Sequence, residues 1–497
     1  MNSNTNAGAL IDLGLSHRAQ GDIEQARAIF EKIVRQDPEH LGAWVELGTL
    51  LTEHFGAYDA AVTALDRALA IAPDDKHALR GRARAEAERG GDALAWYRKL
   101  RNAHMNDPEA RLDLAGALYQ GRDDAGARAE LSALTAMRPD WVKGHGAQAL
   151  LRWQLGECSL FDGFEDALAH DPSNKELWLT CFDALSRAPD YAGMLQCAER
   201  AQSVFKGAHF LDRYEAMAAS ETGDIARADA AFARLGPMND MKSGDMEMEV
   251  ALIRHLLRAG RTAEAARLAE VTVTKPGGAV AWSYLGTAWR LLGDKRWDWL
   301  EGPPNLVFAA DVNVDLAALA TVLRRLHTWR CAPIGQSVRS GTQTAGPLFN
   351  RPEPEIVRLR RAIEDCVQRY VDQLPPRDPR HPFLGAPRGE LGFAGSWSVR
   401  LTSAGFHINH THPQGWISSA MYVALPASIG ADETNPAGWL AFGQPPPELG
   451  LGLAPARLIE PKPGLLVMFP STMWHGTVPF DAGERLTVAF DVLSRGV

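Results

Sequence analysis

The sequence predicts a two-part chain, in which a stack of paired helices precedes a mainly antiparallel β domain. Three observations support this prediction. Through the first part, prolines recur about once every 34 residues between segments with apolar residues at helical spacing. From about residue 294, glycine, proline, tryptophan and phenylalanine become frequent. Short runs rich in valine, phenylalanine, tryptophan and threonine then follow, and such runs between Pro and Gly are typical of strands.

Length and composition restrict the class of protein. A chain of 497 residues predicts two or three domains, and the formal net charge of -9 is spread without a basic block. This charge argues against binding to nucleic acid, which needs clustered Lys and Arg. A basic start and long apolar stretches are both lacking, so we predict neither a signal peptide nor a membrane span. Five scattered cysteines indicate reduced thiols and a cytoplasmic protein. The oligomeric state is not predicted.

The first part, residues 1–293, contains an internal repeat. It is clearest in three segments, namely Leu13-Gly14 with Ala26 and Phe30 before Pro38, Trp44-x-x-Leu47-Gly48 with Ala61 and Leu65 before Pro73, and Trp282-x-x-Leu285-Gly286. The small residues would let paired helices approach closely, and each proline would end one unit. Each helix pair leaves an apolar face that the next pair covers, which predicts a solenoid. An irregular helical bundle is the alternative.

This pattern resembles the tetratricopeptide repeat family over roughly residues 5–293. The likeness is sharp in the first two units and the last, and degenerate between them. The resemblance implies a concave groove that binds a protein, a peptide or another domain of the same chain. Nothing in the sequence identifies that ligand.

The second part, residues 294–497, has one long amphipathic segment and several short apolar runs. Helical periodicity predicts a helix over 353–374. The predicted strands are 396–402, 416–425, 438–442, 465–469 and 485–493. Strands of this length favour an antiparallel sandwich or barrel with the helix packed outside.

Histidines in this second part are candidate metal ligands. His410 and His412 are two residues apart, so both would point to one face of an extended strand. His475 follows the predicted strand 465–469 after a short loop. A histidine-rich turn at the surface and a satisfied core histidine are the alternatives for these two segments.

A candidate anion-binding pair follows ten residues after His475. Arg485 and Thr487 face the same way on the last predicted strand, inside a run that otherwise reads as core. Burying an arginine is costly unless it meets an anion. The alternative is a structural ion pair, for which the candidate partners are Asp481, Glu484 and Asp491.

Together, this spacing resembles the double-stranded β-helix oxygenases that use iron(II) and 2-oxoglutarate. The segments SGTQT (340–344), SSAMYVALP and MFPSTMWHGTVPF resemble a bacterial branch of that family that is often fused to tetratricopeptide repeats. The likeness covers about residues 297–497 and implies a jelly-roll or cupin-like domain. It also implies Fe(II) held by His410, His412 and His475, and 2-oxoglutarate held by Arg485 and Thr487. Dioxygen is the further co-substrate, and no other catalytic residue is implied.

The sequence departs from the family's usual pattern at one ligand. The usual site has two histidines and one carboxylate, and His412 occupies the carboxylate position. Three alternatives follow. His412 is a third ligand, or iron is held by two histidines and water, or the ligand pair is His407 and Asn409 in place of His410 and His412. Further candidate pocket residues are His407, Trp416, Tyr422 and Trp474, although aromatic side chains beside strands are also typical of the core.

The resemblance therefore implies a dioxygenase that hydroxylates a substrate, for which a protein or peptide side chain presented by the repeats is one hypothesis. One alternative is a non-catalytic repeat scaffold with a degenerate oxygenase domain, which the missing carboxylate favours. Another is a three-histidine dioxygenase or isomerase of the cupin type that needs no 2-oxoglutarate. That alternative gives no role to Arg485.

Overall fold

A computed structural model describes residues 3–236, 245–328, 337–344, 346–430 and 435–494. The chain divides into two compact units, both discontinuous in sequence. Unit 1 comprises residues 1–148, 325–330 and 344–357, and unit 2 comprises the remainder. Among the described residues, no helix has the length and apolar character needed to cross a bilayer. Cys331, one of the cysteines predicted to be reduced, lies outside the described residues.

Unit 1 is built from antiparallel helix pairs, as the repeat predicts. Its helices are α1 (Ser3–Gln20), α2 (Ile23–Gln36), α3 (Leu41–Leu50), α4 (Tyr58–Ile71), α5 (Lys76–Arg89), α6 (Ala93–Ala103), α7 (Pro108–Gln120) and α8 (Asp124–Met137), with a π-helical turn η1 (Leu51–Phe55) after α3. The repeat glycines lie where helices touch. A Cβ added at Gly14 would come within 2.6 Å of the Phe30 ring, and one at Gly48 within 2.5 Å of Leu65 Cγ. The prediction of close helix approach at these glycines is therefore confirmed.

A segment from the second half of the sequence also belongs to unit 1. Residues 344–357 pack on helices α4 and α5. The buried guanidinium of Arg351 donates to the Glu88 carbonyl at 2.6 Å and lies 5.3 Å from the centroid of the Tyr58 ring. Nδ2 of Asn350 donates to the His54 carbonyl at 3.3 Å. The chain thus returns to its first repeats after beginning the β domain.

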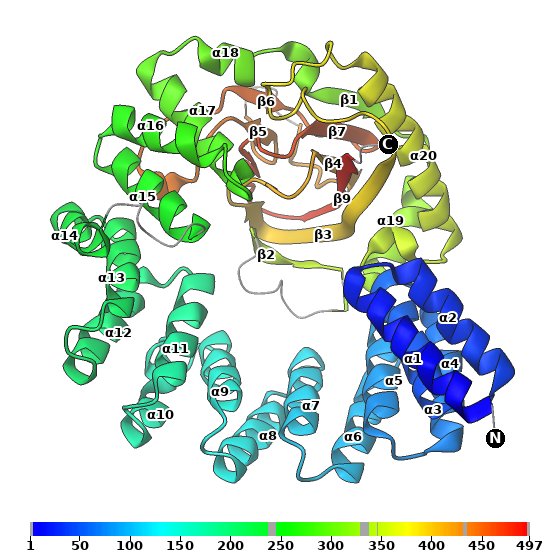
Figure 1. The fold of residues 1–497 in the computed structure, drawn as a ribbon. Coiled ribbons are helices and arrows are strands. Elements are labelled where there is room, and N and C mark those ends of the chain that lie inside the picture. Colours follow the sequence, from blue (N-terminus) through cyan, green and yellow to red (C-terminus); the bar gives the residue numbers. More distant parts are fainter. Residues whose placement is uncertain (1–2, 237–244, 329–336, 345, 431–434, 495–497) are drawn as a thin grey trace. The chain divides into compact units, whose positions relative to one another are not determined.

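Unit 2 continues the helix pairs and then forms the β domain. Its helices are α10 (Glu165–His170), α11 (Lys175–Arg187), α12 (Tyr191–Val204), α13 (Phe210–Glu221), α14 (Ile225–Leu235), α15 (Met246–Arg258), α16 (Thr262–Thr272), α17 (Ala281–Leu292) and α18 (Arg296–Leu300), with most of α19 (Leu316–Leu326) and α20 (Pro354–Gln373). Helix α9 (Val142–Gln154) begins in unit 1 and ends in unit 2. Helix α20 is the helix predicted over 353–374. Its Tyr370 ring stacks on Phe308 of the first strand at 5.3 Å, which places the helix against the sheet (Figure 1).

The strands of unit 2 form two antiparallel sheets. They are β1 (Phe308–Asp311), β2 (Val338–Gln343), β3 (Leu391–His407), β4 (Ile417–Ala424), β5 (Leu440–Phe442), β6 (Arg457–Ile459), β7 (Leu465–Pro470), β8 (His475–Thr477) and β9 (Glu484–Ser494). Within the described residues, one sheet has the order β1-β7-β4-β9-β3-β2 and the other the order β6-β5-β8. Buried Tyr422 and Phe469 of the larger sheet pack with Leu440 and Phe442 of the smaller, so the core lies between the sheets. The predicted double-sheet β domain is confirmed.

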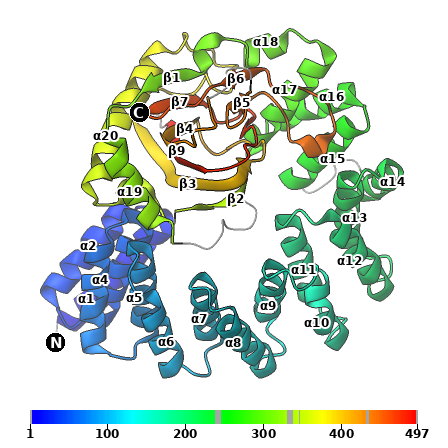
Figure 2. The ribbon, with the colours of Figure 1, turned by 180° about the vertical axis from the view of Figure 1, so that it is seen from behind.

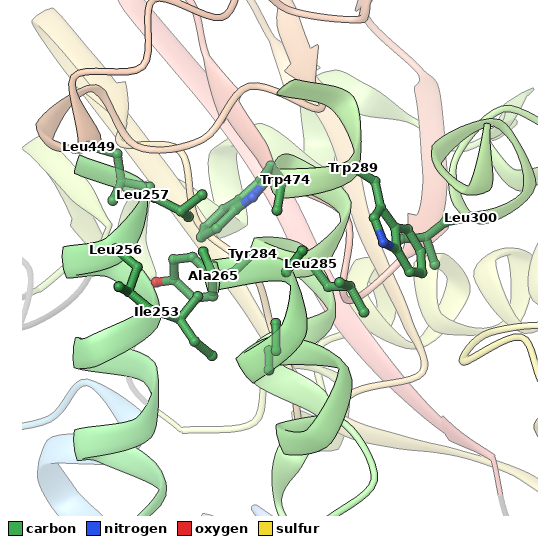
Figure 3. Packing of buried hydrophobic residues seen from close by; sticks show 14 residues of the cluster. Ile253, Leu256, Leu257, Ala265, Tyr284, Leu285, Trp289, Leu300, Leu449 and Trp474 are labelled. Carbon is green, nitrogen blue, oxygen red and sulfur yellow. The ribbon is translucent and has the colours of Figure 1, made fainter. Parts of the chain in front are cut away.

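The last repeat helix of unit 2 packs directly on the β domain. Figures 1 and 2 show α17 and α18 beside strands β5 and β6. The buried indole of Trp474 donates to the Ser283 carbonyl at 3.1 Å and to Thr287 Oγ1 at 3.0 Å. Its ring meets Tyr284 edge to face at 5.2 Å, within one apolar cluster (Figure 3). Helix α17 carries the repeat motif, and it packs both on the preceding repeat helices and on the β domain. The boundary predicted at 293/294 stays a prediction.

We expect Trp474→Ala to lower the free energy of unfolding of this unit by about 3–5 kcal/mol, because it empties a buried indole site. Trp474→Phe keeps the ring contact but removes the N–H donor to the Thr287 hydroxyl and the Ser283 carbonyl, of which the carbonyl still accepts from Thr287 Oγ1 at 2.8 Å, and should cost about 1 kcal/mol. Urea unfolding followed by far-UV circular dichroism measures both. Trp439→Phe is the matched control, since the buried Trp439 indole N–H has no hydrogen-bond partner among the described residues. Equal losses in the two Phe variants would contradict the assigned role of the Trp474 hydrogen bonds.

Candidate metal centre

Three histidines from two separate segments meet in unit 2. His410 and His412 lie in the connection between β3 and β4, and His475 begins β8. Backbone hydrogen bonds join the segments, from His410 N to His475 O at 2.9 Å and from His475 N to His410 O at 3.1 Å. Among the described residues, these histidines form a group whose ligand nitrogens all lie within 4.8 Å of one another. This spacing suits one metal ion bound by three imidazoles.

Hydrogen bonds fix the orientation of each ring. Nδ1 of His410 lies 2.7 Å from the Ile408 carbonyl, and Nδ1 of His475 lies 3.1 Å from the Met473 carbonyl. Nδ1 of His412 lies 2.8 Å from one carboxylate oxygen of Asp491. An Nδ1 that donates to an acceptor leaves Nε2 unprotonated in the neutral ring. All three histidines therefore hold their Nε2 lone pairs available for a metal.

Burial keeps the rings of His410 and His475 neutral. It lowers the pKa of His410 to about 3, with a further contribution from His412. Burial also lowers the pKa of His475 well below its ordinary value, and His410 and His412 add to that shift. A neutral imidazole is the form that binds metals, so the site is ready for a cation at neutral pH.

The alternative register, with His407 and Asn409 as ligands, is not favoured by the geometry. Nδ1 of His407 lies 3.1 Å from Ser337 Oγ, and the same hydroxyl lies 3.2 Å from His410 Nε2. Nδ2 of Asn409 donates to Gln444 Oε1 and to the Pro445 carbonyl, both at 3.3 Å. His407 thus lies beside the histidine group, while the amide of Asn409 is engaged in a loop contact.

Arg485 is buried beside the histidines, and no described residue forms an ion pair with it. Its side chain is 2% exposed, and its Nε has no hydrogen-bond partner among the residues that the structure describes. Burial lowers the pKa of Arg485 from its ordinary value, yet an arginine keeps its charge in proteins. Such a cation is costly to bury and has a strong tendency to bind an anion.

The candidate ion-pair partners of Arg485 are engaged elsewhere or exposed. Glu484 is bound by Arg400 at 2.6 Å and also by Arg324. Asp491 is bound to His412, and Asp481 is exposed. The structural ion pair considered as an alternative for Arg485 is therefore absent among these three carboxylates.

The other predicted pocket residues lie in different places. Thr487 lines the cavity described below, and its Oγ1 donates to the Val399 carbonyl at 3.4 Å. The Tyr422 ring packs against Arg485, and the guanidinium carbon lies 5.0 Å from the centroid of that ring. Trp416 is buried and donates to the Phe383 carbonyl at 2.9 Å, and Trp474 packs on α17. Neither tryptophan is among the described residues that line the cavity; each indole is instead bound to a backbone carbonyl in the core.

One cavity of about 440 Å³ joins these features, a volume typical of small-molecule sites. Its walls include the histidine group, His407, Arg485 and Thr487. Repeat residues that sequence reasoning missed also line it, namely Pro189, Tyr191, Glu221 and Arg254. Their contribution depends on how α12, α13 and α15 pack beside the β domain, which no local pattern reveals.

Sequence reasoning named Asp491 only as one candidate partner of Arg485 in the alternative ion-pair interpretation, and it missed the contact of Asp491 with His412. A signal was present, because alternation along β9 puts Arg485, Thr487 and Asp491 on one face of the strand. Its pairing with His412 depends on the neighbouring strand. Asp491 lies opposite Ser418 of β4, and the Ser418 hydroxyl donates to its carboxylate at 2.6 Å.

The fold and the site define a repeat protein joined to a double-sheet β domain with a group of three histidines that could hold a metal ion. Comparison with known families agrees with both parts. Residues 395–491 match the family described as "Putative 2OG-Fe(II) oxygenase", and residues 11–76 match the tetratricopeptide repeat. The chain thus carries tetratricopeptide repeats and a segment of the 2OG-Fe(II) oxygenase family. That family implies Fe(II), 2-oxoglutarate and dioxygen, and tetratricopeptide repeats generally mediate protein–protein interactions.

Individual relatives resemble shorter parts of the chain. "Cellulose synthase 2 operon protein C" of Komagataeibacter xylinus is 36% identical over 125 residues, which is 24% of this chain and 10% of that protein. Solved structures with similar repeats include MamA from Desulfovibrio magneticus RS-1 (16% identity, 34% of this chain, 97% of that chain, TM-score 0.30). A tetratricopeptide repeat protein from Parabacteroides merdae is 16% identical (50% of this chain, 98% of that chain, TM-score 0.32). Both TM-scores are low, and we infer nothing about this chain from these two structures.

Proposed function

We propose that this protein is a 2-oxoglutarate- and Fe(II)-dependent dioxygenase that hydroxylates a protein or peptide side chain brought to it by the repeats. The observation that carries the proposal is one cavity that holds three converging imidazoles and a buried arginine for which the described part of the chain offers no counter-ion. A cupin-type dioxygenase without 2-oxoglutarate would use the histidines but would give no role to Arg485.

In this proposal each residue has a separate task. His410, His412 and His475 hold Fe(II) through Nε2, and Arg485 binds the distal carboxylate of 2-oxoglutarate as a fork-shaped donor. Thr487 lies two residues away on the same strand face and adds a hydroxyl to that end of the cavity. Fe(II) with 2-oxoglutarate, when bound, supplies oxidative decarboxylation coupled to hydroxylation of a C–H bond. The buried walls exclude water from the reacting centre.

The repeats support a large substrate. Tyr191, Glu221 and Arg254 form part of the cavity wall, so a substrate that reaches the histidines also touches repeat helices. Glu221 is fixed there by two hydrogen bonds from Arg254, at 2.7 and 2.9 Å. Unit 1 has its own groove of about 1290 Å³ along α1, α3, α5 and α7. The repeat residues in the cavity wall suit a polypeptide that contacts these helices while one of its side chains enters the cavity.

Anaerobic titration of the full chain with Fe(II) and 2-oxoglutarate tests the enzyme assignment. We expect the weak visible charge-transfer band that chelation of 2-oxoglutarate produces, and succinate once dioxygen is admitted. Folded protein that binds Fe(II) but shows no band would contradict the proposal. A protein substrate is tested separately by pull-down. Turnover of a free small molecule, with no polypeptide recovered as substrate, would contradict that part alone.

A further inference from the structure

The three candidate ligands differ in what holds their rings. His410 and His475 donate to backbone carbonyls, which are neutral acceptors. His412 donates to the carboxylate of Asp491, with Nδ1 at 2.8 and 2.9 Å from the two oxygens. His412 is also the residue at the position where the usual site has a carboxylate ligand. Position 412 itself therefore has no carboxylate, but the carboxylate of Asp491 lies against the Nδ1 side of the His412 ring.

Asp491 is held firmly in that position. Ser418 lies opposite it in the β4–β9 register, and the buried Ser418 hydroxyl donates to Oδ1 of Asp491 at 2.6 Å. Ser418 also contacts the Ser471 hydroxyl at 3.0 Å, and the His412 backbone N–H donates to the Ser471 carbonyl at 2.8 Å. Ser471 thus holds the backbone of His412, while Ser418 holds the carboxylate of Asp491.

The turn after His412 packs closely against Ser471 and Asp491. Gly415 closes the turn by donating to the His412 carbonyl at 2.9 Å. A Cβ added at Gly415 would lie 2.7 Å from Ser471 Oγ and 3.4 Å from Asp491 Cβ. The side chain of Asp491 is 14% exposed, so its charge is partly shielded from water. Low exposure strengthens its effect on neighbouring charges.

We propose that Asp491 is a positioning residue that supplies, through His412, the negative charge that a carboxylate ligand supplies in the usual two-histidine-one-carboxylate site. The inference rests on the proposed function, because it needs His412 to be a metal ligand. A carboxylate that accepts from Nδ1 fixes the ring and makes Nε2 a stronger donor to the metal. The three-histidine site then carries a charge balance close to that of the usual site.

The first test is the affinity of the full chain for Fe(II), measured by anaerobic calorimetry. Asp491→Asn keeps an oxygen acceptor for His412 and removes the charge. We expect the affinity to fall about 10–100-fold, and the midpoint potential of bound iron to rise. Asp481→Asn is the matched control, since it removes the same charge from an exposed loop residue. Equal affinities in Asp491→Asn and Asp481→Asn would overturn the inference.

The second test separates charge supply from simple support of the fold. His412→Asp places a carboxylate at the ligand position itself, where Asp491 becomes unnecessary. In that background Asp491→Asn should leave Fe(II) affinity unchanged or raise it, because two neighbouring carboxylates no longer repel. A purely structural role predicts additivity, with the same fold-loss in both backgrounds. Additive losses would therefore overturn the inference.

These outcomes are distinguishable from failure of the proposed function. Absence of Fe(II) binding by the unaltered chain overturns both proposals. Fe(II) binding that depends on His410 and His475, yet is insensitive to Asp491→Asn, overturns only the role of Asp491. Thermal unfolding of each apo variant shows whether a loss of affinity reflects the site or the fold.

Discussion

His475→Ala is expected to abolish measurable Fe(II) binding by the full chain. The substitution removes one of three imidazoles whose ligand atoms lie within 4.8 Å of one another. Loss of a group that merely supports a ligand costs roughly 10–100-fold in metal affinity, so loss of the ligand itself should cost more. Anaerobic calorimetry measures the affinity, and the charge-transfer band with 2-oxoglutarate should vanish with it.

His407 provides the control for this experiment. It is a half-buried histidine in the same cavity, and desolvation lowers its pKa well below the ordinary value, as for His475. It lies outside the described group of candidate ligands. His407→Ala should therefore retain Fe(II) binding. If His407→Ala abolished binding while His412→Ala did not, the ligand set would be the alternative that begins at His407.

Arg485→Met is expected to weaken binding of 2-oxoglutarate by roughly thirtyfold to a few thousandfold. Truncating one partner of a buried, hydrogen-bonded charge pair costs about 2–5 kcal/mol, and about 1.4 kcal/mol is tenfold in affinity. Titration of the visible band in Fe(II)-loaded protein gives the dissociation constant. Fe(II) affinity measured without 2-oxoglutarate should change little, because Arg485 is not in the group of candidate ligands.

The same variant has an opposite effect on the apo protein. Replacing a buried cation that lacks a counter-ion by an apolar side chain of similar length should leave the melting temperature unchanged or raise it. Arg400→Met is the matched control on the neighbouring strand β3. Arg400 is 38% exposed and pairs with Glu484, so its loss should not alter 2-oxoglutarate binding. A comparable loss of 2-oxoglutarate affinity in both variants would contradict the role proposed for Arg485.

The long elements of the β domain could be predicted from the sequence because their signals are local. The helix predicted over 353–374 is α20, and the strands predicted over 416–425 and 465–469 are β4 and β7. Short strands such as β6 (Arg457–Ile459) and β8 (His475–Thr477) were missed. Their three residues carry no periodicity, and they are strands only because β5 lies between them.

At the site, the sequence predicts which residues share one face of a strand, but it does not predict which residues from different strands meet. The two-residue separation of His410 and His412, and of Arg485 and Thr487, indicated shared faces. That His412 meets Asp491 depends on the pairing of β4 with β9, two strands far apart in sequence. For Trp474 a local argument was available. Neighbouring residues of an extended segment point to opposite sides, so a tryptophan next to His475 should face away from the metal.

The discontinuity of unit 1 has a consequence for the order of events during synthesis. Arg351 and Asn350 complete contacts with Glu88 and His54 of the first repeats. Those partners leave the ribosome about 260 to 300 residues earlier, and chains emerge at roughly 5–20 residues per second. The first repeats therefore wait tens of seconds with this surface exposed before their last segment arrives. An amino-terminal fragment that ends at residue 293 never receives it.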